Sequence, residues 1–254
     1  MVYIFDGTYR GLLSAVFDAF ANKEFSVRLL TEQQFQSTFF DSSRMIEANS
    51  QKAGRILTGL AKRLTKDQIM DIWKAFLAED LSVSNAIFRL LITIFRGNPK
   101  ILNNYGDADV LYFSQTLRKV NREWHRMKAF VRFQKSDNGM YIAVVEPDFN
   151  VLPLIIIFFR NRYRDQPWLI YDNKRKYGIH YDLSAVTEVT LGHQEAHALV
   201  SQSHLVELDP KDSMYERLWQ SYFQSTNIEA RKNLKLHLRH IPKRYWKYLP
   251  EKMK

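Results

Sequence analysis

Several carboxylates stand at the ends of short apolar runs that are typical of β-strands. Asp6 follows "VYIF", Glu146 and Asp148 follow "MYIAVV", and Asp165 and Asp172 flank "WLIY". Carboxylates in such places can hold a divalent metal or act as general acid and base. They also form turns and cap helices, and Asp6 and Asp148 each precede a predicted helix. The candidates for catalysis are therefore Asp6, Glu146, Asp148 and Asp165, with capping or turn formation as the alternative.

A basic and aromatic segment lies near the C-terminus. Residues 227–254 hold nine Lys or Arg and two acidic residues. Cations spaced by four on a helix can neutralise phosphates, and a nearby tyrosine or tryptophan can stack on an unpaired base. The alternative is a solvated helix end whose aromatic residues pack onto the core. The candidates for nucleic-acid binding in this segment are Arg231, Lys235, Arg239, His240, Lys243, Arg244, Tyr245 and Trp246.

A second basic stripe falls on the most regular amphipathic pattern of the chain, at residues 107–128. Arg118, Arg122 and Arg126 are spaced by four and lie apart from the apolar stripe of the same predicted helix. No acidic residue stands four positions from any of these arginines, as it would on a helix stabilised by i,i+4 ion pairs. We therefore expect Arg118, Arg122 and Arg126 to contribute to nucleic-acid binding as well.

Other kinds of chemistry are disfavoured by what the sequence lacks. Without cysteine it can form no disulfide, thiolate nucleophile, cysteine zinc site or cysteine-held iron–sulfur cluster. The pairs His193/His197 and His237/His240 have spacings that suit a metal on a helix, but neither has a clear third ligand. The glycine-rich phosphate loop, the dinucleotide fingerprint and the esterase elbow are all missing. We predict no metal and no cofactor.

The composition is that of a basic globular protein. The 254 residues include 37 Lys and Arg against 27 Asp and Glu, a formal net charge of +10, and 46% are hydrophobic. Such a charge favours polyanionic partners, which include nucleic acid, phosphorylated ligands and anionic membrane surfaces. The longest apolar run has nine residues (151–159), too few to span a bilayer, and the start does not resemble a signal peptide. A cytoplasmic protein with no membrane contact is expected.

Apolar periodicity predicts a first half that is mainly helical. After a short first strand, "DGT" begins a helix whose apolar face runs from Leu12 to Phe20. The expected elements are strands at 2–5 and 26–30, and helices at 43–64, 66–78, 82–95 and 107–128.

The second half reads as two hairpins around a helix. The turns at 135–139 and 173–176 predict the hairpins, and residues 151–163, with Pro153 in the first turn, predict a buried helix between them. The order strand–strand–helix–strand–strand indicates an antiparallel sheet with a helix on one face. One more strand at 185–191 and helices at 212–224 and 228–240 complete an α+β protein. We expect one compact protein with a helical part to about residue 128, a sheet-containing part at about 129–192 and a basic helical part at about 193–254.

Three phrases together resemble a bacterial family of uncharacterised proteins assigned to DNA metabolism or repair. They are "FDGTYRGLLSAVFDAF", "EPDFNVLPLIIIFFRNRYRDQPWLIYDNKRKYGIHYD" and "NIEARKNLKLHLRHIPKRYWKYLPE", in the family's order. The family's members lie beside a radical-SAM protein assigned to DNA repair, and some are joined to a uracil-DNA glycosylase-like domain. The positions that match the family's motifs are Asp6, Gly7, Glu146, Pro147, Asp148, Asp165, Gln166, Pro167, Trp168, Asn227, Arg231, His240, Pro242, Arg244, Tyr245 and Trp246.

The resemblance implies DNA as the setting and a radical-SAM enzyme as a partner, without giving any residue a role. Three hypotheses follow. The first is a nucleic-acid-binding accessory protein that positions a repair enzyme. The second is a carboxylate-dependent enzyme acting on DNA, such as a nuclease or a glycosylase. The third is a scaffold whose basic surface docks an acidic protein and never touches DNA.

Overall fold

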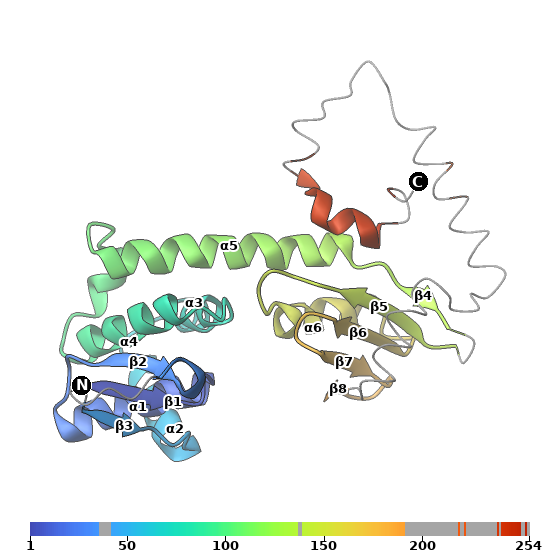
Figure 1. Ribbon diagram of the computed structural model, residues 1–254. Helices are drawn as coiled ribbons and strands as arrows, with labels where there is room; N and C mark the ends of the chain where they lie inside the picture. Colours follow the sequence, from blue (N-terminus) through green and yellow to red (C-terminus); the bar gives the residue numbers. More distant parts are fainter. Residues whose placement is uncertain are drawn as a thin grey trace. The chain divides into compact units, whose positions relative to one another are not determined.

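The structure is a computed structural model that describes residues 1–35, 42–136, 139–190 and 240–249, with residues 218, 221, 238 and 252. The chain divides into two compact units, residues 1–122 and 123–254. Each unit is described by itself below (Figure 1). Among the described residues, no helix is both long enough and apolar enough to cross a bilayer.

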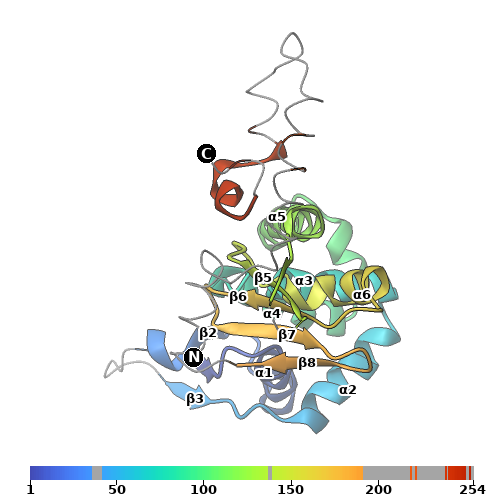
Figure 2. The same cartoon turned by 90° about the vertical axis from the view of Figure 1, so that its right-hand side faces the viewer.

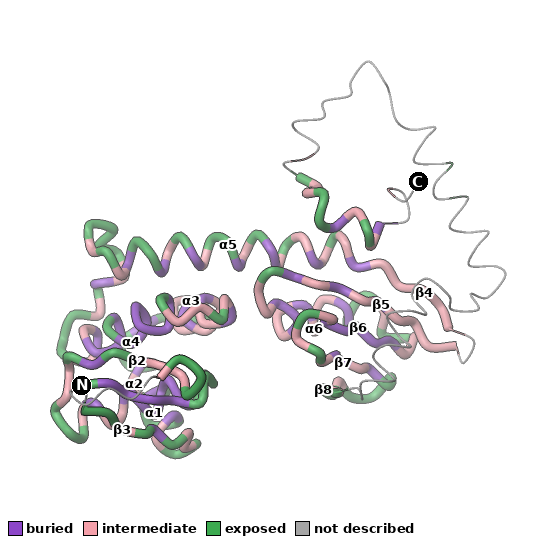
Figure 3. Tube along the Cα trace, in the orientation of Figure 1, coloured by how far each residue is buried: buried purple, intermediate pink, exposed green. Residues whose placement is uncertain are grey.

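The first unit is built on a three-stranded parallel sheet with the order β2-β1-β3. The central strand β1 is buried along its whole length (Figure 3). Asn85 of α4 ties a helix to the edge strand, because its amide bonds both the N–H and the C=O of Leu29 in β2, at 2.8 and 3.0 Å. The elements are β1 (Val2–Phe5), α1 (Tyr9–Asn22), β2 (Arg28–Thr31), η1 (Glu32–Gln34), β3 (Ser43–Met45), α2 (Ser50–Ala61), α3 (Lys66–Phe76), α4 (Leu81–Phe95), η2 (Pro99–Asn103) and the start of α5 (Ala108–Phe130).

Side-chain caps fix where the helices of this unit begin. Thr8 caps α1, Asn49 caps α2 and Asp80 caps α4, while Thr65 forms a capping box with Gln68 at α3. Each cap satisfies backbone N–H groups that the first turn of a helix leaves unpaired. The helices expected at 66–78, 82–95 and 107–128 are confirmed to within two residues at either end.

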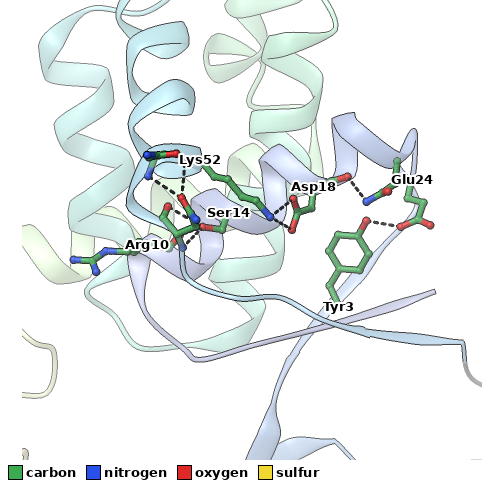
Figure 4. A network of polar contacts seen from close by, with 9 residues as sticks. Tyr3, Arg10, Ser14, Asp18, Glu24 and Lys52 are labelled. Atoms are coloured by element: carbon green, nitrogen blue, oxygen red, sulfur yellow. Dashed lines mark hydrogen bonds and ion pairs between the residues drawn. The ribbon is translucent and has the colours of Figure 1, made fainter.

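A polar network joins the first strand to the first two helices (Figure 4). The buried Ser14 hydroxyl donates to the carbonyl of Arg10 at 2.9 Å and accepts from the N–H of Asn49 at 3.0 Å. Lys52 of α2 pairs with Asp18 of α1 at 2.7 Å. The Tyr3 hydroxyl donates to Glu24, and burial together with this bond raises the pKa of Tyr3 to about 12.

The second unit contains a five-stranded mixed sheet with the order β4-β5-β6-β7-β8. Figure 2 shows β6, β7 and β8 side by side. The chain leaves β5, forms α6 and returns in β6, and these two strands are parallel, whereas every other neighbouring pair is antiparallel. The elements after α5 are β4 (Gln134–Lys135), β5 (Tyr141–Val145), α6 (Leu152–Arg162), β6 (Trp168–Asp172), β7 (Tyr177–Tyr181), β8 (Val186–Val189) and the 3₁₀ helix η4 (Lys243–Tyr248).

The class α+β is confirmed, and so are both hairpins, the strand near 186 and the helix after residue 151. Two expectations are wrong. Residues 43–45 form a third parallel strand, so the helix expected over 43–64 begins only at Ser50. The sheet of the second unit is mixed, because α6 carries the chain back to β5 in a parallel crossover, which a helix between two strands allows. The helices expected at 212–224 and 228–240 fall, apart from a few residues, outside the described chain.

The helix α6 is less enclosed than its apolar sequence indicated. Leu152, Ile155 and Phe159 are buried on one face, while Ile157 is 67% exposed. Phe159 contacts the buried ring of Trp168 in β6, with the ring centroids 6.3 Å apart. One face of α6 therefore packs on the sheet, and another face of the helix is exposed to solvent.

Candidate functional site

The polar residues that could do chemistry in the second unit meet where β5 and β6 end. The two parallel strands stop level with one another, since Val145 pairs with Asp172, so the residues that follow lie side by side. Asn173 continues this pairing through its N–H, which donates to the carbonyl of Val145 at 2.9 Å. Its side-chain amide donates to Glu146 at 2.6 Å. The carboxyl ends of neighbouring parallel strands are a common position for ligand sites in α/β sheets.

The turn after β6 is tied to the loop after β5. The buried Asp172 carboxylate accepts the N–H groups of Lys174 and Arg175 at 2.9 and 3.1 Å and forms an ion pair with Arg175 at 2.9 Å. The same guanidinium donates to the carbonyls of Pro147 and Asp148 at 3.0 and 3.1 Å. Asp172 thus holds an arginine that fixes the backbone of the loop carrying Glu146 and Asp148.

The 3₁₀ helix η4 brings cations from the C-terminal segment to the same place. Arg244 pairs with the buried Glu123 of α5 at 2.6 Å and with Asp148, and Lys247 pairs with Glu146. Glu123 also accepts from the N–H of Asp148 at 3.0 Å, so it bonds both the loop and η4. We call this set the strand-end cluster: Glu123, Glu146, Asp148, Asp172, Asn173, Arg175, Arg244, Tyr245 and Lys247.

Tyr245 is the buried anchor of η4. It is 2% exposed, its hydroxyl donates to Glu123, and its ring lies 5.1 Å from that of Phe130. Burial, helped by the bond to Glu123, raises the pKa of this tyrosine well above its usual range. The ring of Tyr245 thus packs onto the core, which is the alternative to base stacking given in the sequence analysis, and almost none of its side chain is exposed.

The surroundings of Glu146 favour its ionised form. Burial alone would raise the pKa of Glu146, but hydrogen bonds from Lys247 and Asn173 outweigh it, and the pKa lies below the ordinary value of 4.5. Glu146 is therefore a poor proton donor near neutral pH. Within the described part of the chain, no group of three or more His, Asp or Glu is arranged to hold a metal ion.

The sequence placed the carboxylates and the cations in separate hypotheses, and the structure brings four of them together. Glu146 and Asp148, which are candidates for catalysis, are paired with Lys247 and with Arg244, a candidate for binding nucleic acid. These ion pairs therefore largely neutralise the charges of the four side chains. The carboxylate of Asp148 bonds Arg244 and does not cap α6, whose first residue has no side-chain cap.

The other carboxylate candidates stand apart from this cluster. Asp6 belongs to the first unit, where its carboxylate accepts from the N–H of Thr8 at 2.9 Å and from the Thr8 hydroxyl at 2.8 Å, so it supports the cap of α1. A side chain larger than hydrogen at Gly11 would meet that carboxylate, since its Cβ would lie 2.1 Å from an Asp6 oxygen. Asp165 is exposed in the turn before β6.

The cations of α5 belong to both units. Arg118, Lys119 and Arg122, in the first unit, are all exposed. No hydrogen bond or ion pair of their side chains is found in the part of the chain that the structure describes. In the second unit Arg126 lies with its guanidinium carbon 5.9 Å from the ring centre of Tyr245.

The remaining candidates are split by the limits of the described chain. His240 and Lys243 are exposed, and Trp246 is half-buried, with its indole N–H donating to the carbonyl of Ile241 at 3.0 Å. Arg231, Lys235 and Arg239 lie outside the described residues, as do the predicted histidine pairs except His240.

Sequence reasoning missed the buried partner that organises the cluster. Glu123 belongs to none of the predicted sites, although it is the only acidic residue between Asp109 and Glu146 except Asp137. It follows Arg122 and precedes Trp124, on the border between the basic and apolar faces of α5. That position is the one feature of the sequence that marks Glu123 as a possible buried partner for a cation. Asn173, Arg175 and Lys247 carried no comparable signal, because residues of a basic turn and a basic tail are usually solvated.

Comparison with known proteins assigns a family without an activity. Residues 82–251 match a family described as a domain of unknown function, DUF4130. The match contains the whole strand-end cluster and the basic part of α5. Searches of curated proteins and of solved structures give no significant match. The match covers about two thirds of the residues of the chain, so the chain belongs to the DUF4130 family.

Proposed function

We propose that this protein is a nucleic-acid-binding accessory protein of DNA metabolism or repair. It would hold DNA through its exposed cations and work with a radical-SAM enzyme that performs the chemistry. The partner is proposed from the family resemblance of the three sequence phrases, and DNA is proposed from that resemblance together with the charge of the chain.

The observation that carries the proposal is the set of unpaired cations on α5, which we call the α5 stripe: Arg118, Lys119 and Arg122. All three are exposed and have no ion-pair partner in the described structure. The acids nearest to them along α5 are Asp109, which is paired with Arg89, and Glu123, which is buried and paired with Arg244. A helix face of uncompensated cations attracts a polyanion and releases counterions when phosphates bind.

The enzyme hypothesis has less support. The carboxylates of the strand-end cluster are bonded to cations, and the pKa of Glu146 is lowered, which suits an ion pair better than a general acid. Asp6 and Asp165 are not part of that cluster.

The test is binding of fluorescently labelled single- and double-stranded DNA across a salt series. We expect log K to fall with log salt with a slope of several units, and each phosphate contact to contribute about 0.9 to that slope on duplex DNA. Arg118→Glu/Arg122→Glu should weaken binding and lower the slope by about two. Arg231→Glu/Arg239→Glu tests the C-terminal cations in the same way.

The matched control is Lys62→Glu/Lys66→Glu. These two lysines are also exposed, are also four residues apart, and give the same change in net charge in the same unit. If the control lowers the slope as much as the stripe variant, the effect belongs to net charge and the α5 stripe is not the binding face. If the wild type binds neither kind of DNA at low salt, the proposal fails and the protein-docking scaffold takes its place.

A further inference from the structure

We propose that Arg244 and Lys247 together bind a phosphate group of DNA. In the free protein the carboxylates of Asp148 and Glu146 bind these two cations in place of the phosphate oxygens. The loop after β5 would thus act as an internal competitor for DNA. This inference rests on the proposed function and describes how the affinity of the protein for DNA is regulated. The contacts of each cation carry the argument.

The guanidinium of Arg244 is bound along two separate edges. Its Nη2 donates to the carboxylate of Glu123, at 2.6 Å, and to the hydroxyl of Tyr245. Its Nη1 pairs with Asp148. One edge therefore orients the side chain, and the other is directed at an acidic loop.

The two carboxylates that hold Arg244 differ greatly in burial. The Glu123 side chain is 1% exposed, whereas that of Asp148 is 45% exposed. Breaking the buried pair would leave an uncompensated charge in the protein, while Asp148 can separate and be hydrated. A phosphate can thus replace Asp148 while Glu123 and Tyr245 keep the arginine in place.

Lys247 shows the same arrangement. Its side chain is 57% exposed and its partner Glu146 is 30% exposed. Glu146 has a second partner in Asn173, at 2.6 Å, so it keeps a hydrogen bond when the lysine leaves. The ion pair between Glu146 and Lys247 is therefore open to exchange with an incoming anion.

The geometry of η4 places the two cations together. Residues three apart on a 3₁₀ helix lie on the same side, and Arg244 and Lys247 are three apart. Both pair with the same short loop, since Glu146 and Asp148 are separated only by Pro147. Arginine and lysine are the side chains that contact phosphates in nucleic-acid complexes, and a phosphodiester offers oxygens of the kind that the carboxylates now supply.

The experiment compares DNA binding by the wild type and by Glu146→Gln/Asp148→Asn, using the labelled duplex in the same salt series. Removing the two competing charges should tighten binding roughly three- to tenfold, as expected when two exposed ion pairs no longer oppose it. The salt slope should become steeper by about one to two, as one or two more phosphates are engaged. Adding Lys247→Gln to the same chain should reduce the gain, and this change leaves the buried pair of Arg244 with Glu123 intact.

The matched control is Glu32→Gln/Glu188→Gln, which raises the net charge by the same amount at two exposed positions. Equal tightening by this control, or unchanged or weaker binding by Glu146→Gln/Asp148→Asn, overturns the inference while leaving the α5 stripe in place. Asp148→Asn alone serves if circular dichroism shows that the double variant does not fold. Absence of binding by both overturns the inference together with the proposed function.

Discussion

Each of the two units contains a polar network, and the two networks differ in how far their charged side chains are buried. In the first unit, Ser14 and the ion pair between Lys52 and Asp18 join α1 to α2 through contacts of neighbouring helices (Figure 4). In the second unit, the strand-end cluster gathers charges from α5, two strand ends and η4 around the buried Glu123 and Asp172.

The difference shows how burial decides the role of similar chemistry. An ion pair in contact with water contributes about 0–1 kcal/mol, whereas removing one partner of a buried pair costs about 3–5 kcal/mol. The network of the first unit can therefore lose a charge with little effect. The strand-end cluster has a buried part that must stay paired and an exposed part that can exchange partners, and this combination suits a binding site.

The largest effect that would sharpen this comparison is expected from Arg244→Met. The substitution keeps much of the side-chain volume but leaves the Glu123 charge buried without its cation, so the second unit should lose about 3 kcal/mol of stability. Native-state hydrogen exchange of the amides of β6 measures this loss. Arg164→Met, at an exposed arginine of the same unit, is the control and should change it little. If the loss of stability is below about 1 kcal/mol, the pair of Arg244 with Glu123 behaves like an ordinary surface ion pair.

A smaller effect is expected from Ser14→Ala in the first unit. The change leaves the N–H of Asn49 without the acceptor that it has at 3.0 Å, so we expect a loss of about 1–2 kcal/mol. Exchange of the amides of α1 and β1 reports it. The amides of β6 should not change, and a loss of equal size there would contradict the description of two separate units.

Acid should act on the second unit through Glu146. Its folded-state pKa lies below the ordinary value of 4.5, so its contribution to stability is complete above that value and is lost as the pH falls through the folded-state pKa. Glu146→Gln should therefore destabilise the protein at pH 7, and the difference from wild type should shrink below about pH 4.5. Urea unfolding followed by circular dichroism between pH 3 and 7 tests this. A difference that does not depend on pH would mean that the carboxylate charge of Glu146 is not what stabilises the cluster.

The smallest effect is expected from Lys52→Met. Both members of its pair with Asp18 remain partly exposed, so the cost should be about 0.5 kcal/mol. The matched change Lys23→Met, at an exposed lysine of the same unit, gives the baseline for losing a surface cation. A cost close to that of Arg244→Met would remove the distinction between the two networks.

The elements that could be predicted from the sequence are those whose signals are local. The helices after residue 66 have caps and apolar stripes, and both hairpins have turn residues, so their positions follow from short segments. The strand at Ser43–Met45 has no such signal, because its burial alternates over only three residues and its partner β1 lies 41 positions earlier. The parallel pairing of β5 with β6 likewise depends on where α6 packs, which a pattern of strands and helices leaves open.

The same limit applies to the candidate site. Glu146, Asp148 and Arg244 could be selected as chemically capable residues, because carboxylates at strand ends and cations in a basic tail are visible in the sequence. That these residues pair with one another could not be predicted, because the pairs join positions about 100 apart. Glu123, which holds the cluster together, is marked in the sequence only by its position as an isolated acidic residue between the basic and apolar faces of α5.

The anchoring of η4 also has a consequence for how the protein is made. Glu123 and Tyr245 are 122 residues apart, so the carboxylate emerges from the ribosome long before its partners. Until synthesis reaches Arg244, α5 carries an acidic residue destined for the interior with no cation to neutralise it. The second unit can therefore complete its fold only after residues 244 and 245 have been synthesised, and chains that stop before residue 244 should be cleared by cellular proteases faster than chains that contain it.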